Sequence, residues 1–148
     1  MGYGALQVTT GLRNTALGSR AMQSAVTGNN NVGLGYIAMG IVTSGAQNVG
    51  VGNDAGKFTS DGTTANSIGR NSIFIGDSAK ASADNQTNQI VIGVGAVGNG
   101  DNTATIGNTA TTALHVGGNN AGIVLKSPDG TAYKIQVANG GTLTVTAV

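Results

Sequence analysis

Three stretches of this sequence follow one pattern: Asn14-Thr-Ala-Leu17-Gly18-Ser-Arg-Ala21, Asn31-Val-Gly-Leu34-Gly35-Tyr-Ile-Ala38 and Asn48-Val-Gly-Val51-Gly52-Asn-Asp-Ala55. Each places an aliphatic residue and Gly at the same offset after Asn, and the glycines recur every 17 residues. Asn66-Ser-Ile68-Gly69 extends the series by one more period. A fixed period of this length is the signature of a repeat architecture.

The motif continues in a form that is one residue longer. Its copies are Asn71-Ser-Ile73-Phe-Ile75-Gly76-Asp-Ser-Ala79, Asn88-Gln-Ile90-Val-Ile92-Gly93-Val-Gly-Ala96 and Asn102-Thr-Ala104-Thr-Ile106-Gly107-Asn-Thr-Ala110. Apolar residues alternate with variable ones, which predicts a short strand. Gly at the fixed offset suits a tight turn, and Asn at the strand entry can bond the nearby backbone or its counterpart one coil away.

Composition excludes several classes of protein. The chain of 148 residues has 26 Gly, one Pro and no Cys, Trp or Glu, and only 9% of its residues are charged. Since Gly and β-branched residues penalise helices, and 39% of the residues are apolar, we expect neither helices nor a disordered chain. The scattered charges, net +1, and the short apolar runs predict no nucleic-acid partner and no membrane segment.

We therefore predict an all-β fold, in which residues 1–112 form a parallel β-solenoid of roughly 17-residue coils. Its structural residues are the repeated glycines and an aliphatic row: Gly18, Gly35, Gly52, Gly69, Gly76, Gly93 and Gly107, with Leu17, Leu34, Val51, Ile68, Ile75, Ile92 and Ile106. A coil this small encloses little volume, so the row needs a second surface to cover it. We expect several copies to intertwine or pack around one axis, and a homotrimer is the most economical closure.

Residues 113–148 follow a different pattern. Ser127-Pro128-Asp129-Gly130 and Asn139-Gly140 are turn sequences that separate three alternating apolar segments. They predict an antiparallel β-meander with one apolar face, which acts as a cap on the solenoid or as a tip. Three strands alone are marginally stable, so we expect this sheet to pack against its copies in the oligomer.

At these residues the chain resembles two groups of fibrous proteins. The copies around Ile73–Gly76 and Ile90–Gly93 are similar to the repeat of the head domains of trimeric autotransporter adhesins, which are trimeric parallel β-rolls. The 17-residue copies and the segment 122–137 look more like bacteriophage tail-fibre proteins. The resemblance implies a homotrimeric fibre of a virion, an extracellular appendage used for host attachment.

Motifs that suggest chemistry are better explained by the repeat. Gly93-Val-Gly95-Ala-Val-Gly98 matches a dinucleotide-binding spacing but lacks the following helix and acidic residue. His115 is the sole histidine and has no recognisable nucleophile, and no Asp lies in an aromatic setting. We predict a non-enzymatic protein with no catalytic residue, cofactor or metal, against the alternative of a glycan-hydrolysing spike.

Two aromatic residues are candidate surface contacts. Tyr36 occupies a repeat position that Ser19 and Asn53 share, and Phe58 lies in Lys57-Phe-Thr-Ser-Asp61, which interrupts the linker composition and is expected to protrude. Expected partners are the other two copies, virion proteins at one end, and a host cell-surface glycan or protein. Two alternatives remain: a capsid-decorating head fibre without receptor role, and the head of a bacterial trimeric surface adhesin.

Overall fold

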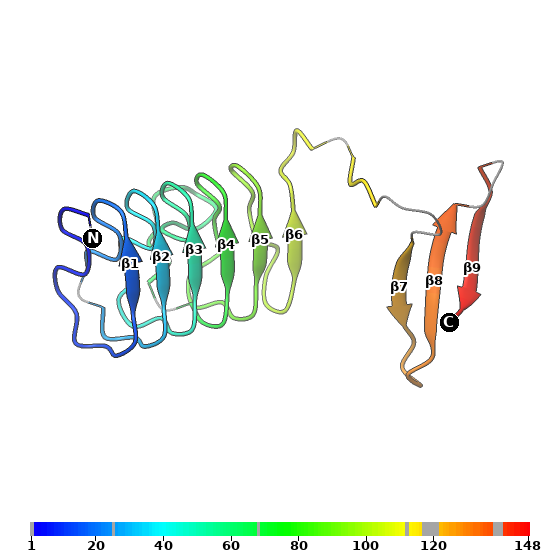
Figure 1. Cartoon of the computed structure of the whole chain (residues 1–148), viewed down its shortest axis with the longest axis horizontal. Helices are drawn as coiled ribbons and strands as arrows, with labels where there is room; N and C mark the ends of the chain where they lie inside the picture. The colour runs from blue at the N-terminus through cyan, green and yellow to red at the C-terminus, as the bar shows by residue number, and fades with distance from the viewer. Residues whose placement is uncertain (1, 25, 68, 112, 117–121, 138–140) are drawn as a thin grey trace. The chain divides into compact units, whose positions relative to one another are not determined.

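The computed structural model describes residues 2–24, 26–67, 69–111, 113–116, 122–137 and 141–148. It divides into two compact units, Met1–Thr111 and Thr112–Val148; the sequence analysis set this boundary one residue later. No described residue is helical (Figure 1). The strands are β1 (Thr15–Leu17), β2 (Val32–Leu34), β3 (Val49–Val51), β4 (Ile73–Ile75), β5 (Ile90–Ile92), β6 (Ala104–Ile106), β7 (Ile123–Lys126), β8 (Ala132–Val137) and β9 (Leu143–Ala147).

The first unit is a parallel β-solenoid, as predicted. Strands β1 to β6 form one sheet in sequence order, and each pairs in parallel with the strand of the next coil. The coils stack along the sheet in Figure 1, with one three-residue strand each. Because the side chains of successive coils stand in register, residues of one type form columns along the axis.

Glycine forms the column that follows the strands. Gly18, Gly35, Gly52, Gly76 and Gly93 have φ between 129° and 136°, a region that L side chains rarely adopt. A Cβ on Gly18 or Gly35 would lie 2.4 Å from the carbonyl oxygen of the next glycine in the column. Both the backbone conformation and the close stacking of coils therefore require glycine here.

Asparagine forms a buried column before the strands. The backbone N–H and Nδ2 of Asn31 donate to Oδ1 of Asn14 at 2.9 and 3.2 Å, and Asn48 donates to Asn31 at 3.0 and 3.2 Å. Their Nδ2 atoms also donate to backbone carbonyls, including that of Gly45 at 2.8 Å. This asparagine ladder, Asn14, Asn31 and Asn48, confirms the predicted bonding both to the backbone and to the stacked counterpart.

The prediction that Gly69 follows Gly52 in the glycine column after the strands is wrong. Val51 pairs with Ile75, 24 residues along the chain, so Gly76 is the residue that continues the column after Gly52. Gly69 instead accepts Nδ2–H of Asn48 at 2.7 Å, as Gly45 does from Asn31. It therefore belongs to a second glycine column at the opposite turn, and Ile68 lies outside the described residues.

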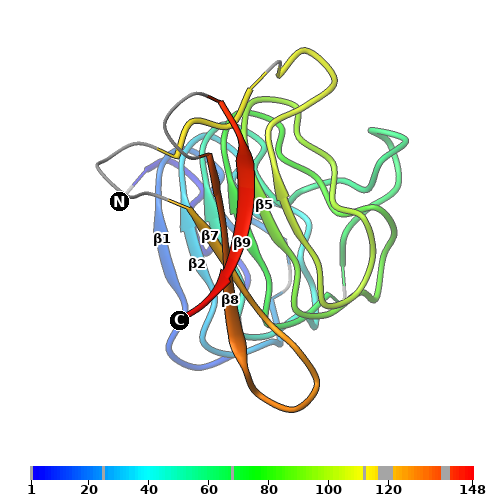
Figure 2. The ribbon, with the colours of Figure 1, turned by 90° about the vertical axis from the view of Figure 1, so that its right-hand side faces the viewer.

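The long coil contains an inserted hairpin. Phe58 bridges Ala65 in antiparallel fashion, and the N–H of Thr59 donates to the carbonyl of Thr64 at 2.8 Å. Thr59 also bridges Ala81 of the next coil in parallel, which holds the hairpin against the solenoid. In Figure 2 this green segment projects on the side of the solenoid away from strands β1 and β2.

The two lengths of motif differ in where asparagine lies. Ser72 and Gln89 continue the column of Asn48: the N–H of Ser72 donates to Oδ1 of Asn48 at 3.0 Å, and that of Gln89 to Oγ of Ser72 at 3.1 Å. The asparagines of the longer motif occupy the preceding, left-handed position. Its members have φ between 53° and 59° and are Arg13, Asn30, Gln47, Asn71, Asn88 and Asn102. Asparagine tolerates this conformation better than most residues.

The interior of the solenoid changes composition along its axis. In the first coils Met22 and Met39 are fully buried against Gly33 and Gly50, the middle residues of β2 and β3. In later coils the middle residues are large, Phe74 and Val91, and the facing column holds small residues. Five alanines line this interior with no exposed surface: Ala21, Ala38, Ala55, Ala79 and Ala96.

The second unit is an antiparallel three-stranded sheet in the order β7-β8-β9, which confirms the predicted meander. Ile123 pairs with Ile135, and Ile135 pairs with Val145. The N–H of Gly130 donates to the carbonyl of Ser127 at 2.9 Å and closes the first turn. Residues 139–140, expected to form the second turn, lie outside the described residues.

Candidate interaction surface

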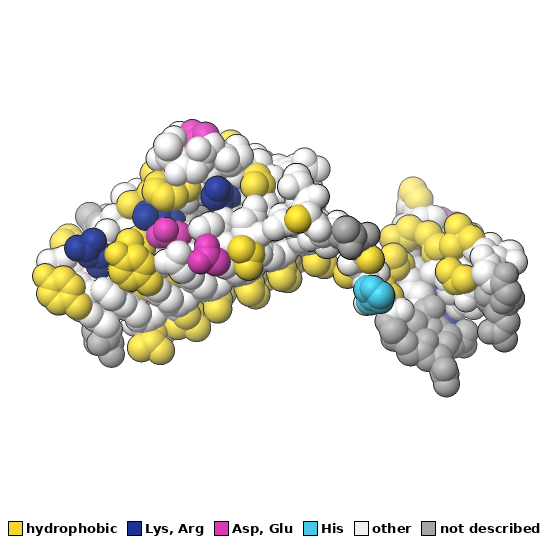
Figure 3. All heavy atoms as spheres, turned by 90° about the horizontal axis from the view of Figure 1, so that it is seen from above, with side chains coloured by type: hydrophobic (Ala, Val, Ile, Leu, Met, Phe, Trp, Pro, Cys, Tyr) yellow, Lys and Arg dark blue, Asp and Glu magenta, His cyan; other side chains and the backbone are white. Residues whose placement is uncertain are grey.

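The outer face of the solenoid sheet is apolar along its length. The middle residue of each strand points inward, while the first and third point outward and remain partly or largely exposed. We call these outward positions the apolar face: Thr15, Leu17, Val32, Leu34, Val49, Val51, Ile73, Ile75, Ile90, Ile92, Ala104 and Ile106. Figure 3 shows a row of hydrophobic side chains along one long edge of the solenoid.

The apolar face has two columns, of which one matches the predicted aliphatic row without Ile68. Leu17, Leu34, Val51, Ile75, Ile92 and Ile106 form one column through strand pairing. A second column, led by Val32, Val49, Ile73 and Ile90, runs beside it. This column was not among the predicted residues, although the alternation within each strand places it two residues before the first.

No charged side chain belongs to the apolar face, and its only polar member is Thr15. Leu17 and Ile106, at the two ends, are 59% and 57% exposed, while Ile75 and Ile90 are each 38% exposed. Soluble proteins rarely leave a continuous apolar surface of this extent open to water. Such a face is typical of a surface that packs against another chain.

The meander carries a second apolar face. Strand register places eight side chains on one side of the sheet: Ile123, Leu125, Tyr133, Ile135, Val137, Leu143, Val145 and Ala147. The other side carries Lys126, Lys134, Gln136, Thr144 and Thr146 among its residues. No described side chain of this unit is fully buried, so the sheet has no covering layer of its own.

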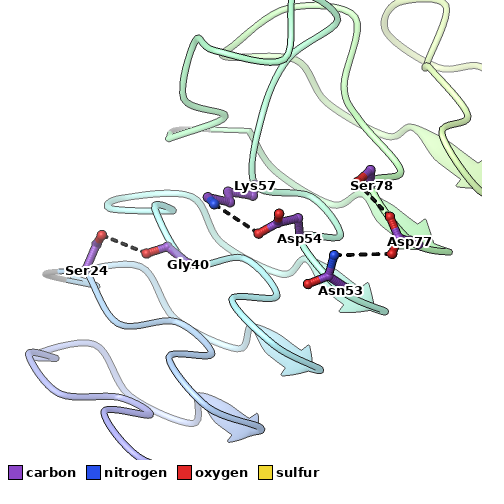
Figure 4. A network of polar contacts seen from close by, with 7 residues as sticks. All are labelled: Ser24, Gly40, Asn53, Asp54, Lys57, Asp77 and Ser78. Carbon is purple, nitrogen blue, oxygen red and sulfur yellow. Dashed lines mark hydrogen bonds and ion pairs between the residues drawn. The ribbon is translucent and has the colours of Figure 1, made fainter.

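The two candidate surface contacts have different environments. Tyr36 is 49% exposed, as its position in the repeat predicts. Phe58 is only partly exposed, and the ammonium of Lys57 lies 4.5 Å from the centre of its ring. Lys57 also pairs with Asp54 at 2.9 Å (Figure 4). Phe58 bridges Ala65 at the base of the inserted hairpin, so the polar residues between them, and not Phe58, form the protruding part.

The acidic side chains of the two turns are engaged in local hydrogen bonds. Asp61 accepts from the N–H groups of Thr63 and Thr64 and from the Thr64 hydroxyl, and these bonds hold its pKa well below the ordinary value. A hydroxyl hydrogen bond from Ser127 likewise lowers the pKa of Asp129. Both carboxylates are therefore ionised acceptors that stabilise turns.

The residues that could suggest a cofactor site or catalysis do not form a site in the described part of the chain. Gly93 and Gly95 lie in the turn after β5, and His115 is exposed in the chain segment between β6 and β7. Among the described residues no group of three or more His, Cys, Asp or Glu side chains is placed to hold a metal ion. The described part of the chain also has no helix long and apolar enough to span a membrane.

Comparison with known proteins identifies no relative. No family model matches the chain, and neither the curated proteins nor the solved structures gave a significant match. The class that the fold and surface define is a β-solenoid with an exposed apolar sheet face and a separate β-meander.

Proposed function

We propose that this chain is a non-enzymatic structural segment of a bacteriophage fibre, in which three copies pack through the apolar face to form a stiff rod. The observation that carries the proposal is the apolar face, two columns wide and free of charge over six coils. Its assignment to a virion fibre rests on the resemblance of the repeats and of segment 122–137 to tail-fibre proteins.

The two columns suit a threefold arrangement. In a ring of three identical chains each interface is heterologous, so one column of a chain contacts the other column of its neighbour. Both columns are then buried, and the coils stack in parallel around one axis. The meander supplies a second apolar face in every copy, which the same assembly can cover.

The inserted hairpin also supports an assembly of this kind. It is the one long departure from the 17-residue spacing between paired strands, and it lies away from β1 and β2 (Figure 2). Packing through the apolar face leaves it free on the outside of the rod. Three copies would present three such hairpins, and weak contacts to a host surface would add by avidity.

The packing is tested by the native mass of Ile92→Asp. Charge on strand β5 of the apolar face would be buried unpaired in the assembly, so the variant is expected to remain a single chain of 14.4 kDa while the natural sequence gives three times that mass. Val94→Asp is the matched control: Val94 is 65% exposed, two residues later, in the turn. A monomeric natural chain, or an unaffected Ile92→Asp trimer, would contradict the proposed packing.

A separate experiment tests whether the protein is part of a virion fibre. Antibodies against the purified chain, visualised with gold by electron microscopy, are expected to label an appendage of the phage particles released from the source culture. Labelling of the bacterial envelope with no label on particles would favour a surface adhesin instead. Label confined to the capsid would favour a head fibre.

A further inference from the structure

The turns that follow the strands carry a second surface, distinct from the apolar face. Tyr3, Arg20 and Tyr36 come from three successive coils at these turns, and all three are exposed. Tyr3 is 83% exposed and Tyr36 49% exposed. We call these three residues the tyrosine–arginine stripe. Figure 3 looks onto the turns after the strands and shows hydrophobic, cationic and acidic side chains close together there.

The backbone holds the stripe rigidly. The N–H of Arg20 donates to the carbonyl of Tyr3 at 2.8 Å, and the N–H of Asp54 donates to that of Tyr36 at 2.9 Å. The N–H of Ile37, which follows Tyr36, donates to the carbonyl of Ser19 on the preceding coil at 2.9 Å. Since adjacent coils are about 4.8 Å apart, the two tyrosines are about 9.6 Å apart along the axis. These bonds place Ser19 between them in the same column, and Arg20 in the adjacent column on the middle coil.

The acidic side chains near the stripe have hydrogen-bond or ion-pair partners, whereas the side chain of Arg20 has none among the described residues. Asp54 pairs with Lys57 at 2.9 Å, and Asp77 accepts from Nδ2 of Asn53 at 3.2 Å and from Oγ of Ser78 at 2.8 Å (Figure 4). No residue in the described part of the chain bonds or pairs with the Arg20 guanidinium. The stripe therefore offers one unpaired cation on the coil between those of two exposed tyrosines.

We propose that this stripe binds an acidic saccharide chain. An exposed tyrosine presents a flat apolar ring and a phenol to the mixed surface of a sugar, and Arg forms paired hydrogen bonds with a carboxylate. Because backbone hydrogen bonds already order the turns that carry the stripe, binding costs the ordering of the side chains but not of the backbone. The inference rests on the proposed function, since it names the chemistry of a partner for the fibre.

The test compares an acidic with a neutral oligosaccharide. Tetragalacturonic acid carries a carboxylate on each ring, and tetra-N-acetylchitotetraose is uncharged. The chain has no Trp and three Tyr, at positions 3, 36 and 133, so tyrosine fluorescence reports binding at the stripe and calorimetry gives the affinity. The natural chain is expected to bind the acidic probe more tightly than the neutral one, and added salt should reduce the difference.

The variants separate the stripe from general charge attraction. Arg20→Ala is expected to weaken binding of the acidic probe about tenfold and to leave the neutral probe unchanged. Tyr36→Ala is expected to weaken both. Arg13→Ala is the matched control, since Arg13 is also exposed, has φ of 58° against 57° for Arg20, and lies at the other end of β1. It should bind as the natural chain does.

Three results would overturn the inference: no binding of tetragalacturonic acid, an unchanged affinity in Arg20→Ala, or an equal loss in Arg13→Ala. The native mass of each sample is measured alongside. Binding by a chain that proves monomeric would sustain the stripe and refute the trimeric packing. A trimer without binding would do the reverse.

Discussion

At the scale of single residues, the hydrogen bonds of the asparagine ladder hold the first coils in register. Asn31 has no exposed surface and its amide makes hydrogen bonds to Asn14, Gly45 and Asn48. An apolar residue there would leave the buried N–H of Asn48 and the carbonyl of Gly45 without partners. The ladder thus makes coil stacking specific, because a slipped coil would lose these bonds.

Asn31→Ala is accordingly expected to lower the free energy of unfolding by about 3 kcal/mol, since two buried backbone groups lose their partners. Denaturant unfolding followed by circular dichroism measures the change. Asn53→Ala, at an exposed position, should change it by less than about 0.5 kcal/mol. Equal effects of the two substitutions would show that the buried ladder contributes no special stability.

At the scale of the coil, large and small residues compensate across the interior. Gly56 occupies the position of Met22 and Met39, and a Cβ on it would lie 2.9 Å from Cδ2 of Phe74. Phe74 is 1% exposed and fills the space that the methionines occupy in earlier coils. The exchange of Met–Gly for Gly–Phe keeps the volume of each coil similar.

This exchange predicts that Gly56→Ala destabilises the solenoid by about 2 kcal/mol, partly from backbone strain at φ of 67° and partly from overlap with Phe74. Gly95→Ala isolates the backbone part, since its φ is 63° and nothing lies within 4 Å of the added Cβ; it should cost about 1 kcal/mol. Adding Phe74→Leu to Gly56→Ala should then cost less than the sum of the single changes, which a double-mutant cycle measures.

The inserted hairpin is expected to open in acid. Because the pKa of Asp61 is lowered in the folded chain, its contribution to stability is complete above the ordinary carboxyl pKa of about 4. That contribution is lost as pH falls through the lowered value. Protection of the Thr63 and Thr64 amides from hydrogen exchange should fall in that window. In Asp61→Asn the protection should already be low at neutral pH, and constant protection in the natural chain would contradict the sign.

At the scale of the whole molecule, the chain is divided between a solenoid with its own narrow interior and a sheet with none. The meander's eight apolar side chains have no covering layer in their unit. A single three-stranded sheet is marginal in water, so its stability depends on what covers that face. In the proposed trimer, the other two copies of the chain cover that face.

Val145→Asp is therefore expected to unfold the meander or to lower the native mass, since Val145 lies on its apolar face and is 60% exposed in the isolated chain. Thr146→Asp, one residue later on the polar side, should leave the mass and the β-sheet spectrum unchanged. Light scattering and circular dichroism measure both. If the two variants behave alike, the face is not covered in solution.

Much of the fold could be predicted because glycine and asparagine recur at fixed positions of the repeat. The glycine column needs a positive φ, and each coil stacks on the same column of the coil before it, so glycine recurs in the sequence at the coil period. The alternating strands and the turn at Ser127–Gly130 are set by local sequence. These features determined the solenoid, its stacked columns and the meander.

The tertiary structure decided what depends on neighbours in space. Gly69 satisfies the 17-residue period in sequence, yet pairing of Val51 with Ile75 removes it from the strand column, because the hairpin returns the chain to the same turn after extra residues. Likewise, only strand register brings Val32, Val49, Ile73 and Ile90 beside the predicted aliphatic row. Local pattern fixes a residue's conformation, whereas its partners are fixed by which coil lies next to it.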